Sequence, residues 1–94
     1  MIKHIVLWRL HDRANAPAMK AALETLPALI PVICKLQVGV NLVPGDAAAD
    51  LVLDSEFATL ADLEAYLKHP EHLKVVAFIR PLVSERRVVD FEIP

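Results

Sequence analysis

Two histidines and the single tyrosine of this chain are the side chains best suited to moving protons. Histidine changes charge near neutral pH; desolvation lowers its proton affinity, and a nearby acceptor raises it. His4 and His72 could therefore act as a general acid or base, and the hydroxyl of Tyr66 could donate a hydrogen bond to a carbonyl or enolate oxygen. His72 would then take a proton from the carbon next to that carbonyl.

Each of these three residues also has a purely structural interpretation. His4 lies in an apolar stretch, where a hydrogen-bonded core histidine is common. Tyr66, near the end of an expected helix, could pack through its ring and keep its hydroxyl at the surface. Tyr66 and His72 are six residues apart with Pro70 between them, so their spacing alone does not show that they converge.

Other chemistry has weaker support. His69 and His72 could be two metal ligands, but no third ligand is evident, so we expect no metal site. His69 precedes a proline and is interpreted as part of a turn. The chain has two glycines and no glycine-rich phosphate loop, so we expect no cofactor. Cys34 has no base near it in the sequence and is expected to be an ordinary strand residue.

Four strands are expected to carry these residues. Leu36, Val38 and Val40 alternate with polar or small residues, which is the period of a strand with one buried face. The same reasoning, together with β-branched and large apolar residues, predicts the strands at residues 2–11, 33–43, 50–57 and 83–93.

Prolines and caps mark the helices between these strands. Pro17 fits a first helical turn, and Pro27 should end or kink that helix. Thr59 is expected to cap a second helix, with an apolar stripe formed by Leu60, Leu63 and Leu67. Pro70 fits the first position of a further helix at residues 71–79.

The predicted order is β-α-β-β-α-(α)-β, which is the split βαβ or ferredoxin-like order. It corresponds to an α+β domain over residues 1–94, with a four-stranded antiparallel sheet and helices on one face. The other face combines apolar residues with Lys35, Gln37, Asp54 and Glu56, which suits either solvent or a wet cavity between two sheets.

The composition restricts the partners. Hydrophobic residues make up 55% of the chain, so a domain of this size should bury excess apolar surface against a second copy. The net charge of -2 argues against nucleic acid and a polybasic membrane anchor. The apolar stretch at residues 5–8 is too short for a signal peptide or membrane span, so we expect a cytoplasmic protein.

Four segments resemble the stress-responsive A/B barrel domain (Dabb) family of the dimeric α/β barrel superfamily. They are residues 1–10, 50–57, 63–72 and 86–91, and the resemblance covers nearly the whole chain. Its most specific part is the Tyr-x-x-His-Pro-x-His segment, which follows an early strand histidine. The resemblance implies a homodimer whose two sheets face each other and close an eight-stranded barrel.

The family includes a plant polyketide cyclase, of the olivetolic acid type, which closes a linear polyketide by aldol condensation without a cofactor. Its motif falls on His4, Tyr66 and His72, so the resemblance implies that these are the catalytic residues. The first hypothesis is therefore a cofactor-independent acid/base enzyme, similar to a cyclase or isomerase, acting on a small carbonyl or aromatic compound. One alternative is a non-catalytic, stress-related or small-ligand-binding dimer. Fold analogy adds a cofactor-free monooxygenase as a further alternative.

Overall fold

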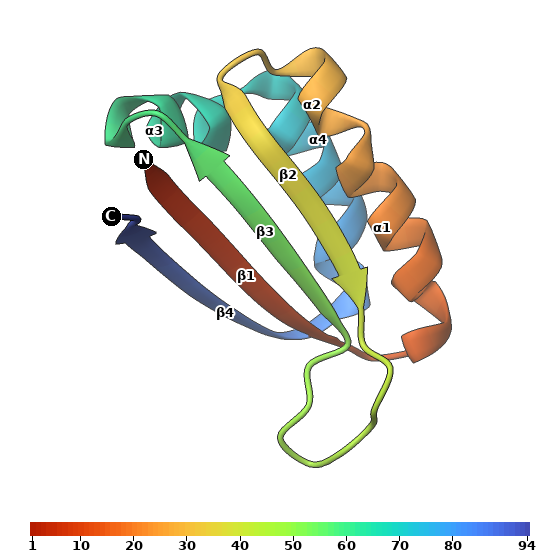
Figure 1. Cartoon of the computed structure of the whole chain (residues 1–94). Coiled ribbons are helices and arrows are strands. Elements are labelled where there is room, and N and C mark those ends of the chain that lie inside the picture. Colours follow the sequence, from red (N-terminus) through yellow and green to blue (C-terminus); the bar gives the residue numbers. More distant parts are fainter.

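Four strands form one antiparallel sheet in the order β2-β3-β1-β4 (Figure 1). The computed structural model describes all 94 residues. The strands are β1 (Ile2–Leu10), β2 (Ile33–Val40), β3 (Leu51–Phe57) and β4 (Val83–Glu92). Each neighbouring pair is antiparallel, with β1 between β3 and β4. The predicted ferredoxin-like arrangement is confirmed.

The helices lie together on one face of this sheet (Figure 1). They are α1 (Ala16–Glu24), α2 (Leu26–Leu29), α3 (Leu60–Lys68) and α4 (Pro70–Ile79), with short 3-10 turns η1 (Arg13–Asn15) and η2 (Arg80–Leu82). Prolines set the breaks as expected, because Pro27 lies at the start of α2 and Pro70 begins α4. The side chain of Thr59 caps α3 by accepting a hydrogen bond from the backbone N–H of Asp62. None of these helices has the length and apolar character that crossing a membrane requires.

Two expectations were wrong, one about the end of β2 and one about the apolar stripe of α3. Strand β2 ends at Val40 rather than at residue 43, because Val40 pairs with Leu51 at the very start of β3. Beyond that pair the chain leaves the sheet, and Leu42 and Val43 are exposed. Leu60 was expected in the apolar stripe of α3 but is also exposed, since the helix buries Leu63 and Tyr66 instead.

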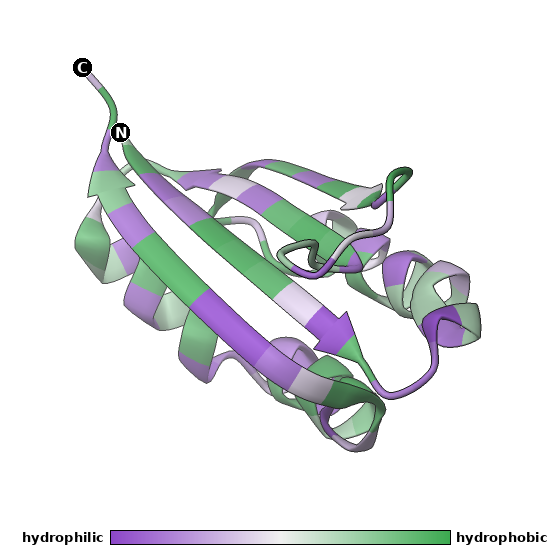
Figure 2. Ribbon diagram, turned by 90° about the horizontal axis from the view of Figure 1, so that it is seen from below, coloured by the Kyte–Doolittle hydropathy of each residue, from purple (hydrophilic) through white to green (hydrophobic).

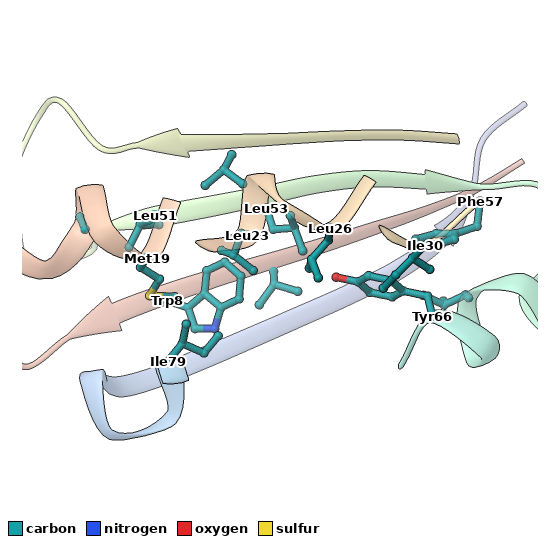
Figure 3. Packing of buried hydrophobic residues seen from close by; sticks show 14 of the residues in the cluster. Trp8, Met19, Leu23, Leu26, Ile30, Leu51, Leu53, Phe57, Tyr66 and Ile79 are labelled. Atoms are coloured by element: carbon teal, nitrogen blue, oxygen red, sulfur yellow. The ribbon is translucent and has the colours of Figure 1, made fainter. Parts of the chain in front are cut away.

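The core lies between the sheet and the helices. Alternate residues of β1 point into it, because successive side chains of a strand face opposite ways. Figure 3 shows Trp8 of β1 packed with Met19 and Leu23 of α1 and with Ile79 of α4. His4 belongs to the same alternating set as Trp8 and is therefore buried in this layer.

No helix covers the opposite face of the sheet, which we call the open face. The alternation of hydrophobic and hydrophilic residues along the strands is visible in Figure 2. Lys3 on this face lies 3.2 Å from Asp54 and 3.5 Å from Glu56, measured between the ammonium nitrogen and the nearest carboxylate oxygen. Its exposed apolar residues are Leu7, Val89 and Phe91. The predicted mixture of charged and apolar side chains is thus present on one uncovered surface.

Candidate functional site

A cavity of about 560 Å³ lies between the helix-covered face of the sheet and helices α3 and α4. Its walls are mainly apolar, with Val6 and Trp8 from β1 and Val75, Val76 and Ile79 from α4. His4, Tyr66 and His72 all line this space. The structure therefore brings together the three residues that the sequence had placed on three separate elements.

His4 is held by a carboxylate on the neighbouring strand. The register of β1 and β4 places Asp90 directly opposite His4, and Nδ1 of the ring lies 2.5 Å from Oδ1 of Asp90. A carboxylate accepts hydrogen bonds, so Nδ1 carries the proton and donates it to Asp90. The other ring nitrogen, Nε2, makes no hydrogen bond within the protein, and in the neutral ring it is an acceptor.

Tyr66 is completely buried, and its hydroxyl has no hydrogen-bond partner in the protein. Its ring lies between the other two site residues, with centroids 4.4 Å from His72 and 6.1 Å from His4. Figure 3 shows that the ring enters the interior from α3 with its hydroxyl directed inward. Burial raises the pKa of Tyr66 to about 12, and the positive charge of Arg86 opposes part of this rise. At neutral pH the hydroxyl is therefore protonated and able to donate.

His72 is half-buried in the first turn of α4. Its Nδ1 lies 3.1 Å from the carbonyl oxygen of Leu67, so Nδ1 carries a proton and donates it. Burial lowers the pKa of His72, against the opposing effect of the Leu67 carbonyl; the charges of neighbouring groups lower the pKa further. The ring is therefore neutral at pH 7, and its Nε2 holds a free lone pair.

His69 and Cys34 lie outside this group. His69 is the N-cap of α4, and its Nδ1 accepts a hydrogen bond of 3.1 Å from the backbone N–H of Glu71. This is the turn role expected from the following proline. Cys34 is exposed, at an irregularity of the β2–β3 pairing.

The comparisons with known proteins agree with this architecture. The model of the Stress Responsive A/B Barrel Domain, Dabb, matches residues 2–93. The chain belongs to the stress-responsive A/B barrel domain family. A stress-response A/B barrel domain-containing protein of Arabidopsis thaliana is 27% identical over 97% of this chain, which spans 36% of that relative's length.

Solved structures extend the comparison. A dimeric protein of unknown function and ferredoxin-like fold from Bacteroides fragilis is 37% identical, with a TM-score of 0.89 over 98% of this chain and 95% of that one. A hydroxynitrile lyase from Passiflora edulis has a TM-score of 0.85 over 99% of this chain and 93% of its own. At 20% identity, this second similarity shows the fold alone.

Sequence reasoning on this A/B barrel domain missed Asp90 and Arg86. Both lie on the helix side of β4, where Asp90 pairs with His4 and Arg86 pairs with Trp8. Alternation along residues 83–93 was recognisable, and it puts the two residues on one face. Which residues of β1 they meet depends on the register between strands at opposite ends of the chain, which no local pattern specifies.

Replacing Tyr66 with phenylalanine should not destabilise the A/B barrel domain. A buried hydroxyl without a partner costs roughly 1–3 kcal/mol, whereas removing a satisfied one loses about 1 kcal/mol. We expect the free energy of unfolding of Tyr66→Phe, measured by urea denaturation, to equal or exceed that of the wild type. A loss of more than about 1 kcal/mol would mean that the hydroxyl has a partner in the folded protein.

His72 should make the stability of the domain depend on pH. Because its pKa is lower in the folded protein than the ordinary value of about 6.5, the unfolded chain binds more protons below that pH. We expect the wild type to lose stability relative to His72→Gln as pH falls from 7 through about 6.5 toward the lowered pKa. Urea denaturation at each pH would measure this difference, and the exposed His11→Gln is the control that should leave the wild-type pH profile unchanged.

Proposed function

We propose that this protein is a cofactor-independent acid/base enzyme that acts on a small carbonyl compound, with His4, Tyr66 and His72 as its catalytic residues. The observation that supports this most is the Tyr66 hydroxyl, which is buried, protonated and without a partner beside the ring of His72. A donor in this condition is ready to bind an oxygen atom of a ligand, because the folded protein offers it no competing acceptor.

The proposed reaction begins with a carbonyl oxygen accepting a hydrogen bond from Tyr66. Nε2 of neutral His72 then takes a proton from the carbon next to the carbonyl, and the electron pair of the broken C–H bond moves to the oxygen as an enolate. Tyr66 stabilises that negative charge. Its high pKa supports this role, since the phenol keeps its proton while donating.

Two outcomes complete the reaction. In an isomerase-like reaction on a β,γ-unsaturated carbonyl compound, the enolate is conjugated with the neighbouring double bond; protonated His72 returns its proton to the far carbon of that bond, and the double bond shifts toward the carbonyl. In a cyclase-like reaction, the enolate carbon forms a bond to a second carbonyl, whose oxygen takes the proton back from protonated His72. Nε2 of His4, which is oriented by the hydrogen bond from Nδ1 to Asp90, would accept a hydrogen bond from the hydroxyl group formed in this step.

Deuterium exchange tests the proton transfer without knowledge of the natural substrate. A panel of small aryl methyl ketones in D₂O would be followed by proton NMR at the carbon next to the carbonyl. We expect the wild type to accelerate exchange and His72→Gln to reduce the enzymatic rate roughly 10²–10⁴-fold. His11→Gln changes an exposed histidine outside the cavity and should retain the wild-type rate.

The same experiment separates the enzyme from the non-catalytic alternative. That alternative is favoured by the largely apolar lining of the cavity, which would suit a small apolar ligand without any reaction. Ketones that bind but exchange no faster than in buffer would support a binding protein. Wild-type exchange rates in both His4→Gln and His72→Gln would also end the enzyme proposal.

We also propose that two copies of the chain pair through the open face. The Bacteroides fragilis relative, 37% identical, is described as dimeric. In this chain the open face presents Leu7, Val89 and Phe91 to solvent, with exposed fractions of 41%, 59% and 44%. A second copy would remove this apolar surface from water and place the two sheets face to face.

Light scattering would test this pairing. At micromolar concentration we expect twice the mass of one chain for the wild type and the mass of one chain for Val89→Arg, because a charge would be buried in the interface. Leu60→Arg places the same charge on α3, away from the open face, and should remain a dimer. A wild type with the mass of a single chain would contradict the proposal.

A further inference from the structure

The cavity has two chemically different ends. His4, Tyr66 and His72 form one end, and Arg80 and Arg86 line the other. On β4, Asp90 opposite His4 and Arg86 opposite Trp8 are four residues apart, or about 13 Å along a strand. His72 in α4 and Arg80 at the start of η2 are eight residues apart, or about 12 Å along a helix. Both lengths separate backbone positions, and the side chain of Arg86 reaches close enough to the first end for its charge to lower the pKa of Tyr66 and of His72.

The section between the ends is apolar. Figure 3 shows Tyr66 and Trp8 apart in the layer of buried side chains, with Ile79 beside Trp8 and the hydroxyl of Tyr66 directed toward the middle of the layer. Val75 and Val76 of α4 and Val6 of β1 line the space between the two ends. A bound molecule that reached both ends would therefore cross an apolar stretch.

Neither arginine at the second end is neutralised by the protein. Arg80 and Arg86 form no ion pair, and neither guanidinium makes a hydrogen bond. The acidic groups near them are already bound: Glu85 to Arg87 at 2.8 Å, and Asp90 to His4. Glu85 also lines this end of the cavity, but its carboxylate is bound by Arg87 rather than by Arg86. Two cationic side chains are thus available to a ligand.

We propose that the site takes an elongated substrate with a carboxylate at Arg86 and Arg80 and a carbonyl group at Tyr66. The position of the carbonyl rests on the proposed function, whereas the carboxylate end rests on the two arginines alone. A planar guanidinium can donate two parallel hydrogen bonds to a carboxylate, which gives both affinity and orientation. Holding the substrate at its far end would bring the carbonyl to Tyr66 in a fixed position.

Matched acids and amides test both ends. The probes are the methyl-ketone acids 5-oxohexanoate, 7-oxooctanoate and 9-oxodecanoate with their primary amides, and the measurement is the Kd by calorimetry. We expect the wild type to bind at least one of the three acids roughly tenfold tighter than its amide, and the chain length with the largest preference measures the distance between the arginines and Tyr66.

Four variants test which residues cause the preference for the acid over the amide. Arg86→Gln should remove most of the advantage of the acid over its amide, and Arg86→Lys should retain part of that advantage. Arg87→Gln is the matched control, since it removes the same charge one residue away on the other face, and it should retain the full preference. Tyr66→Phe should weaken the binding of the acid and the amide by the same factor, because both carry the ketone.

The outcomes separate this inference from the proposed function. Three outcomes would overturn the proposed carboxylate site: equal binding of acids and amides, no binding of any acid, or an unchanged preference in Arg86→Gln. None of them would contradict the proposed acid/base function, which the deuterium-exchange experiment tests. An acid preference that depends on Arg86, together with no catalysed exchange, would retain the carboxylate site and remove the acid/base function.

Discussion

His4 and Asp90 meet across β1 and β4, and the chemistry of the cavity depends on this pairing. A histidine in an apolar layer requires a hydrogen-bond partner, because an unpaired buried polar group is costly. Asp90 supplies that partner while 38% of its side chain remains exposed, so the protein does not fully desolvate a carboxylate. A shift of one residue in this register would turn Asp90 to the open face and place an apolar neighbour opposite His4.

The break between α3 and α4 brings Tyr66 and His72 together. In one continuous helix, residues six apart are separated by about 600° of rotation, which is about 240° around the axis, and so lie on different faces. A separate helix, α4, begins at Pro70 instead, and the side chain of His69 caps it. The ring centroids of Tyr66 and His72 are then 4.4 Å apart. The conspicuous Tyr-x-x-His-Pro-x-His segment thus works as a geometric unit, in which the two central residues make the turn.

Local patterns in the sequence were enough for the elements and for three of the site residues. Alternation predicted the strands, prolines predicted the helix breaks, and the types of His4, Tyr66 and His72 indicated proton chemistry. Contacts between residues far apart in the sequence could not be predicted in this way. Asp90 and Arg86 join the site only through the pairing of the first and last strands, and β2 ends at Val40 because β3 begins at Leu51. No short window of sequence contains either relation.

In the protein alone, the buried hydroxyl of Tyr66 has no hydrogen-bond partner, and the guanidinium of Arg86 at the cavity forms no ion pair. Polar groups left without partners are typical of a site that binds a ligand. Strand β4 connects this site with the open face. It is an edge strand that pairs only with β1, and its residues alternate between Arg86 and Asp90 on the cavity side and Val89 and Phe91 on the open side. In the proposed dimer, burial of Val89 and Phe91 would hold the edge strand against β1. Self-association would then add to the backbone pairing that already sets Asp90 against His4 within each chain, so that the proposed interface and the site would stabilise each other through one strand.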